Sequence, residues 1–183
     1  LLTFTTASSE AALPKAMSIM EKFGVPKSIV GFVMPTGYTF NLDGSTLYLA
    51  MAVLFSTQLV GIHLTFEQQL VIMFALMLTS KGVAGVPRAS IIVLAGTLTS
   101  FNIPIVGVAV LLGIDQILDM GRTTVNLIGN CIATIVIARW ENAFDYNKMA
   151  DFIKLRNLKT NTLTKINSNV SFQHDFSVEK VEA

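Results

Sequence analysis

Two long apolar stretches of this sequence are interrupted near their middle by polar or small residues. The first runs from Ile29 to Ile62 and contains Asn41-Leu42-Asp43-Gly44, and the second runs from Glu67 to Phe101 and contains residues 80–87. Inside a bilayer, a broken helix is tolerated only where the break is buried in protein or lines an aqueous cavity, because every backbone N–H and C=O needs a partner. The sequence therefore predicts broken helices gathered around a shared polar interior.

Composition places the chain in the membrane class. Hydrophobic residues make up 52% of it and charged residues 14%, against about 25% charged in soluble domains. The formal net charge of +1 excludes the basic footprint of a nucleic-acid partner. The single cysteine, Cys131, excludes an intrachain disulfide or a multi-cysteine metal site, and we expect no cofactor. The predicted fold class is an all-α membrane protein.

Hydrophobic periodicity and breaker residues divide the chain into segments. The helix expected from Glu10 to Phe23 is ended by Gly24 and Pro26. The apolar pieces on either side of residues 80–87 are each too short for the ~20 residues that a spanning helix needs, which favours a re-entrant hairpin. A last apolar segment, from Ile105 to Ala138, is long enough to span by itself.

The chain is expected to comprise two parts. Residues 1–138 would be embedded in the membrane, and residues 139–183 would form a polar, partly disordered tail. Arg139, Lys148, Lys154 and Arg156 place this tail in the cytoplasm by the positive-inside rule. Because the chain opens without an initiator Met, we expect it to be the C-terminal piece of something longer, with further spans upstream.

Six polar residues fall on one face of the last apolar segment, within an arc of ~100°. A charge at the bilayer centre costs at least ~2.5–3.5 kcal/mol on insertion scales, so such residues usually face a cavity, pair with one another or serve a substrate path. The alternative is a polar seam that packs helices through an i, i+3 ion pair of Asp119 with Arg122. The six are Asp115, Asp119, Arg122, Thr123, Asn126 and Asn130.

The interruption at Asn41 and Asp43 has two readings. An unwound backbone beside Gly44 would free carbonyl oxygens for a hard cation, with the Asp43 carboxylate as a charged ligand. The same residues also form ordinary helix-breaking turns.

Two further short segments, which we call the first and second tips, contain residues that could bind an anion or form a gate. Ser8 and Ser9 precede a helix whose free N–H groups could hold a carboxylate, although ordinary N-capping explains them equally well. Gly82, Gly85 and Pro87 supply the conformational freedom of a hinged gate, or of a plain loop.

Taken together, these segments resemble the signature sequences of the dicarboxylate/amino acid:cation symporter family, whose bacterial members include glutamate and aspartate carriers. The resemblance covers residues 1–140 in the family's order, and four separate motifs make it more specific than any one pattern. The motifs are Thr6-Ala7-Ser8-Ser9-Glu10, Asn41-Leu42-Asp43-Gly44-Ser45, Lys81-Gly82-Val83-Ala84-Gly85-Val86-Pro87 and Asp119-Met120-Gly121-Arg122-Thr123-Thr124-Val125-Asn126.

The resemblance implies the glutamate-transporter fold, with re-entrant helical hairpins and broken transmembrane helices. Residues 1–138 would form half of the first hairpin, the seventh span, the second hairpin and the eighth span of a transport domain. That domain would move as an elevator within a homotrimer in the bacterial inner membrane, a multi-pass protein of the plasma membrane. The implied function is symport of a small acidic amino acid, glutamate or aspartate, with protons and/or sodium.

Residue roles follow from the resemblance position by position. Arg122 would pair with the substrate's side-chain carboxylate and Asp119 with its α-ammonium. The other implied substrate residues are Ser8, Ser9, Ser45, Val86, Ser90, Thr123 and Asn126. Cation sites would be lined by Gly37, Thr39, Asn41, Asp43, Asn126 and Asn130, and the gate by Gly82, Gly85 and Pro87.

Asn130 departs from the pattern of sodium-coupled relatives, which carry an Asp there, and it matches proton-coupled bacterial glutamate carriers. The resemblance therefore implies that uptake is driven at least partly by protons. Two alternatives stay open: a C4-dicarboxylate symporter, and a structural or channel-like membrane subunit that transports nothing. No nucleophile–base pair, metal cluster or phosphate loop indicates an enzyme.

Overall fold

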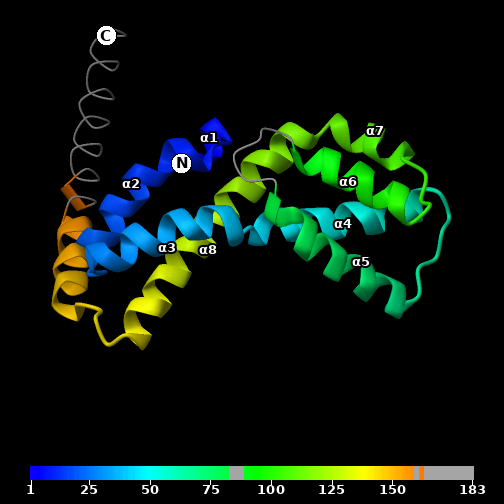
Figure 1. The fold of residues 1–183 in the computed structure, drawn as a ribbon. Helices are drawn as coiled ribbons and strands as arrows, with labels where there is room; N and C mark the ends of the chain where they lie inside the picture. The colour runs from blue at the N-terminus through cyan, green and yellow to red at the C-terminus, as the bar shows by residue number, and fades with distance from the viewer. Residues whose placement is uncertain (83–88, 159–160, 163–183) are drawn as a thin grey trace, which may run out of the picture. The chain divides into compact units, whose positions relative to one another are not determined.

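The computed structural model describes residues 1–82, 89–158 and 161–162, and within these residues all regular structure is helical. The chain divides into two compact units, one of Leu1–Glu21 with Val25–Phe144 and the other of Lys22–Gly24 with Asp145–Ala183. Figure 1 shows the helices, which in chain order are α1 (Leu2–Thr6), α2 (Ser9–Lys22), α3 (Lys27–Phe40), α4 (Asp43–Leu59), α5 (Phe66–Thr79), the 3₁₀ turn η1 (Ser80–Gly82), α6 (Ala89–Ser100), α7 (Val106–Leu112) and α8 (Asp115–Trp140).

The N-terminal tip consists of two helices joined at a left-handed residue. Helix α1 ends at Ala7, whose φ is 48°. The Ser8 hydroxyl then accepts a hydrogen bond from the Ala11 N–H at 3.3 Å, which satisfies one of the free donors at the start of α2. The predicted helix from Glu10 to Phe23 is confirmed by α2, which ends just before Gly24, a residue with a φ of 109°.

The break predicted in the first apolar stretch is confirmed, and it covers fewer residues than the predicted Asn41-Leu42-Asp43-Gly44. Only Asn41 and Leu42 lie between α3 and α4, with ψ angles of 73° and 57° that no helix adopts. Asp43 is already the first residue of α4, where its charge complements the positive end of the helix dipole. Both broken pieces pack against α8.

The apolar core of the larger unit lies around the second half of α4. Helices α5, α6 and α7 all pack on α4, and α6 also contacts α5 and α7. Helix α5 begins with a capping box in which Thr65 and Gln68 bond reciprocally. The buried residues of this cluster are Leu49, Ala52, Val53, Ile72, Leu76, Leu94, Leu98, Ile103, Val108 and Leu111.

The last apolar segment differs from the sequence prediction, because the structure divides it at Gly113 and Ile114 into α7 and α8. Apolar periodicity alone does not reveal this break. Its consequence is that Asp115 begins a helix, where a carboxylate is favoured by the dipole. Among the residues described, α8 is the one helix long and apolar enough to cross a membrane, whereas α5 and α6 are apolar but shorter.

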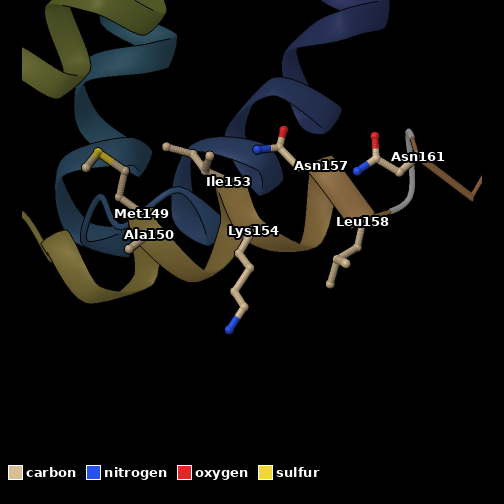
Figure 2. Close-up of a pocket in the computed structure, with 7 residues that line it drawn as sticks. All are labelled: Met149, Ala150, Ile153, Lys154, Asn157, Leu158 and Asn161. Carbon is tan, nitrogen blue, oxygen red and sulfur yellow. The ribbon is translucent and has the colours of Figure 1, made fainter.

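The smaller unit is built on a helix over residues 146–158. Phe152 of this helix meets Phe23 edge to face, with ring centroids 5.8 Å apart. The helix also lines a shallow, mainly apolar groove, in which the side chains of Met149, Ala150, Ile153, Lys154, Asn157, Leu158 and Asn161 are drawn in Figure 2.

Candidate functional site

The polar face predicted on the last apolar segment is the buried face of α8. Arg122 is 6% exposed and Asn130 is 2% exposed, and the buried stripe continues to Thr134, one turn beyond the predicted set. Asp119 is partly buried. The stripe therefore faces α3 and α4 rather than the surroundings, as expected for charges that need partners.

Arg122 lies at the centre of an ionic cluster. Its Nε atom donates to Asp119 Oδ1 at 2.9 Å, and its Nη1 atom lies 3.4 Å from Asp115 Oδ1. Its guanidinium also stacks over the ring of Tyr48, with Cζ 4.6 Å from the ring centroid. A buried guanidinium needs such compensation because an unpaired charge would carry the full cost of leaving water.

Tyr48 was not predicted from the sequence as part of the site. Asp115 was predicted on the polar face, but its contact with Arg122 was not. The Tyr48 hydroxyl donates to Asp115 Oδ1 at 3.2 Å, so that the phenol and the carboxylate together fix the plane of the guanidinium. In the described part of the chain, the other oxygen, Asp115 Oδ2, is buried without a hydrogen-bond partner. The available signal was weak: Tyr48 lies three residues after Ser45, on the same face of a helix.

Asn126 joins α8 to the start of α4. Its Oδ1 atom accepts hydrogen bonds from the backbone N–H groups of Gly44 at 2.8 Å and Ser45 at 3.2 Å, and its Nδ2 atom donates to Ser45 Oγ at 3.0 Å. Leu42 offers no side-chain cap to α4, so this neighbouring helix supplies the cap instead. The approach requires Gly44, where a Cβ would collide with the Arg122 carbonyl and the Val125 side chain.

A second polar chain surrounds the break between α3 and α4. The amides of Asn41 and Asn130 are oriented by their hydrogen-bond partners. Asn41 Nδ2 donates to Asp43 Oδ1 at 2.8 Å and to Oδ2 at 3.2 Å. Asn130 Nδ2 donates to Asn41 at 3.1 Å and to the Gly37 carbonyl at 3.2 Å, and its oxygen accepts from the Tyr38 N–H at 3.3 Å. Asp43 is the exposed member of this network.

The η1 turn, at the base of the second tip, also contacts the residues around the break between α3 and α4. The Lys81 Nζ atom donates to the Phe40 carbonyl at the end of α3. One residue earlier, Ser80 Oγ lies 3.3 Å from Thr46 Oγ1 on α4. The base of the α5–α6 pair is thereby held against both halves of the broken helix.

The structure brings the predicted residues into three groups. Arg122 Nε donates to Asp119, and Thr123 Oγ1 donates to the same carboxylate at 3.3 Å. Asn126 and Ser45 are joined by hydrogen bonds of their own. Other hydrogen bonds connect Gly37, Asn41, Asp43 and Asn130.

The remaining predicted residues lie at the ends of helices. Ser8 and Ser9 are partly buried at the tip between α1 and α2, and α1 packs on α8. Thr39 lies in the last turn of α3, Ser90 is buried at the start of α6, and Gly82 ends η1. The other predicted gate and substrate residues, Gly85, Val86 and Pro87, lie outside the described residues.

The sequence of the chain matches a known family over most of its length. The model of the sodium:dicarboxylate symporter family matches residues 1–140. The chain belongs to this symporter family. The match covers both halves of the broken helix and the whole of α8, so both polar networks fall inside the family region.

Curated relatives are about half identical to this chain over the residues that align. It is 53% identical over 153 residues to a proton/sodium-glutamate symport protein of Geobacillus stearothermophilus, covering 84% of this chain and 36% of that protein. It is 52% identical over 148 residues to the proton/glutamate-aspartate symporter of Escherichia coli, covering 81% and 34%. It is 49% identical over 162 residues to the C4-dicarboxylate transport protein of Bacillus subtilis, covering 87% and 38%. The chain thus spans about a third of each relative's length.

Proposed function

We propose that this chain forms the C-terminal part of the transport domain of a secondary symporter for acidic amino acids, driven by protons and/or sodium. The observation that carries the proposal is the buried Arg122, held between Asp119 and Asp115 beside the start of α4. The names of the relatives support the same class of substrate, since they specify glutamate, aspartate or C4-dicarboxylates.

Arg122 is the group that would select an acidic side chain. A guanidinium offers five N–H donors in a planar fork and binds a carboxylate through two parallel hydrogen bonds. Asp115 and Asp119 each contact one nitrogen of the guanidinium, which leaves N–H donors for a ligand. Tyr48 and Asp115 hold the guanidinium in place from the side of α4 and the start of α8.

Asp119 is the group that would distinguish an amino acid from a dicarboxylate. Two carboxylates contact one guanidinium, so the α-ammonium of a substrate would restore the balance of charge when its side-chain carboxylate engages Arg122. A C4-dicarboxylate brings no cation. The chain's similarity to a C4-dicarboxylate transport protein keeps that substrate as the second candidate.

Several other residues complete the proposed substrate site. Thr123 donates to Asp119 in the cluster, and Ser45 and Asn126 bond to each other between α4 and α8. Ser8, Ser9, Val86 and Ser90 would contribute from the two tips. Gly82, Gly85 and Pro87 would form the gate, because glycine allows the backbone rotation that opening needs.

The membrane architecture is part of the proposal. Helices α5 and α6 lie side by side and are each too short to span, which supports a re-entrant hairpin. The α1–α2 tip would be half of a first hairpin. The domain would move as an elevator in a multi-pass homotrimer of the bacterial inner membrane, with residues 139–183 as a cytoplasmic tail. A structural subunit is the contrasting class, in which the Arg122–Asp119 pair would only pack helices.

The deciding experiment is uptake into proteoliposomes that contain the complete carrier. Initial rates would be measured for labelled glutamate, aspartate and succinate, with the sodium and proton gradients set independently. We expect saturable uptake with either amino acid preferred over succinate. Asp119→Ser should narrow that preference, because it removes the partner of the ammonium. Equal competition by succinate would favour the dicarboxylate carrier, and no uptake of any substrate would favour the structural subunit.

A further inference from the structure

We propose that two groups of the chain itself, the Lys81 ammonium and the Asn130 amide, occupy the positions at the break between α3 and α4 where a metal cation would bind. The inference deepens the proposed function, on which it rests, by naming the coupling ion. The family description names sodium, and the resemblance places cation ligands at Gly37, Asn41, Asp43 and Asn130. The contacts of these residues do not fit a bound metal ion.

The first observation is that Asn130 donates where a cation ligand must accept. Its Nδ2 atom is directed at the Gly37 carbonyl, 3.2 Å away, and at the Asn41 side-chain oxygen, 3.1 Å away. Those two oxygens are the kind of ligand that a hard cation takes. The NH2 group placed between them donates to both, so it puts a positively polarised group where a metal ion would have to lie.

The Asn130 side chain also has no room to turn away. It is 2% exposed, and its own oxygen is held by the Tyr38 N–H at 3.3 Å. It fills the space over Gly37, where even a Cβ would collide with it. The Tyr38 N–H and the Gly37 carbonyl, both of α3, therefore favour the donating orientation of the amide.

The Asp43 carboxylate, which would be the charged ligand, is similarly engaged. Both of its oxygens accept hydrogen bonds from Asn41 Nδ2. Asp43 lies directly against Gly129, where a Cβ would collide with the carboxylate. Hydrogen bonds thus run without interruption from the Tyr38 backbone through two amides to Asp43, and none of their members needs a metal ion.

The second observation is independent and concerns Lys81. Its ammonium donates to the carbonyl of Phe40, the last residue of α3. The carbonyls of a final helical turn lack intrahelical partners and carry the negative end of the helix dipole, so this position favours a cation. Lys81 supplies that cation as a side chain of the protein itself, a tethered ammonium. Ser80 beside it contacts Thr46 on the α4 side of the break.

The physical consequence is a change in what holds the Ser80–Gly82 turn against the broken helix. With an external ion, this contact would depend on ion concentration. With a tethered ammonium, the Ser80–Gly82 turn is drawn to α3 without sodium. The driving ion of the carrier must then be bound elsewhere, and a proton is the candidate that needs no cage of oxygen ligands.

The test measures ion binding by stability rather than by transport. The complete carrier would be purified in detergent, and its Tm would be recorded in sodium chloride and in choline chloride at equal ionic strength. We compare the parent, Asn130→Asp, Lys81→Met and Lys81→Arg. Asn147→Asp and Lys148→Met make the same charge changes at exposed positions of the tail and serve as matched controls.

We expect the parent and both control variants to have the same Tm in the two salts. Asn130→Asp replaces the amide donor between the two oxygens by a charged acceptor, so sodium should raise its Tm by roughly 2–5 °C. Lys81→Met should show a smaller sodium-specific rise, and Lys81→Arg should show none because it keeps the tethered charge.

A sodium-specific rise in the parent would overturn the proposal, and so would a parent and variants that are all indifferent to sodium. If Asn130→Asp does not fold, the comparison of Lys81→Met with Lys81→Arg decides in its place. Because this readout needs no substrate, it stands even if the carrier takes up none of the acidic substrates. The failure of the inference and the failure of the proposed function are therefore distinguishable.

Discussion

The two halves of α4 lie in opposite environments. Its first residues, Asp43 to Ser45, meet the polar face of α8 through hydrogen bonds and tight glycine contacts. Farther along, the helix buries Leu49 and Val53, each no more than 1% exposed, among the apolar side chains of α5, α6 and α7. The 17 residues of one helix thus connect a polar network with an apolar cluster.

This difference in environment predicts different effects for substitutions in the apolar part and in the polar part of α4. In the apolar half, packing is non-directional and its contribution scales with the volume filled, so truncation should lower stability and leave selectivity unchanged. In the polar half, each group has a specific partner, so removal of one group leaves another buried and unsatisfied. The predictions below test this division, from the largest expected effect to the smallest.

The largest effect is expected from Arg122→Cys. The variant removes the buried guanidinium that would bind the substrate's side-chain carboxylate, and loss of one partner of a buried charge pair costs about 3–5 kcal/mol. Uptake of glutamate and aspartate should fall by at least about a hundredfold. The measurement is the initial rate of uptake in proteoliposomes. Neutral amino acids should be admitted in their place, because the selecting charge is gone.

The control for this prediction is Arg122→Lys, which keeps the charge but cannot bind in two parallel hydrogen bonds. It should retain more acidic uptake than the cysteine variant. If Arg122→Cys transports glutamate at the parental rate, Arg122 belongs to a packing seam and the polar half of α4 loses its proposed role.

Leu98→Ala tests the apolar cluster that packs on α4, from the side of α6. Leu98 is fully buried in the cluster of α4, α5, α6 and α7. The truncation should destabilise the protein by about 2–5 kcal/mol, seen as a lower Tm, while the KM for the transported substrate stays at the parental value. Leu78→Ala is the matched control, because that leucine is 78% exposed. A changed substrate preference in Leu98→Ala would contradict the division between the two halves.

The sequence alone predicted the parts of this molecule that depend on local signals. The break at Asn41 and Leu42, the polar face of α8 and the Asp119–Arg122 pair follow from composition and from helical spacing. Those signals act within a few residues, so they can be recognised in the sequence without knowledge of the tertiary structure.

Other features depend on which helices meet, and no local signal carries them. The stacking of Tyr48 on Arg122, the Asn126 cap on α4 and the contact of Lys81 with Phe40 all join residues far apart in the chain. The division between α7 and α8 was also missed, because Gly113 and Ile114 lie in an apolar run with no strong breaker. Here packing, rather than local preference, determines the break.

Asn126→Ala should have an intermediate effect. It leaves the N–H groups of Gly44 and Ser45 without their acceptor in a buried place, which costs about 1–3 kcal/mol. The Tm should fall, and Asn126→Asp should recover most of the loss because it restores an acceptor at the start of α4. If the alanine and aspartate variants are equally stable, the cap contributes nothing and the two halves of α4 are held by packing alone.

The smallest effect is expected where the same kind of cap lies in water. Asp145 Oδ1 accepts hydrogen bonds from the N–H groups of Lys148 and Asn147, each at 3.0 Å, at the start of the helix over residues 146–158. The N–H of Lys148, its ammonium and the N–H of Asn147 hold the pKa of Asp145 below its ordinary value. A carboxyl whose pKa is lowered by folding stabilises the folded state above its unfolded pKa, and that contribution is lost as the pH falls through the folded value. The start of this helix should therefore loosen below about pH 4.

Amide hydrogen exchange at Asn147 and Lys148 would measure this loosening, after correction for the intrinsic pH dependence of exchange. We expect faster exchange as the pH is lowered through that range in the parent, and no such rise in Asp145→Asn, whose amide caps a helix without titrating. Asp145→Ala should exchange quickly at every pH because it has no cap to lose. Since both groups cap a helix through a side-chain oxygen, the contrast with Asn126 isolates burial as the cause of the larger effect. Identical pH profiles for the parent and Asp145→Asn would show instead that the carboxylate does not hold this helix end, and that the exposed cap contributes nothing.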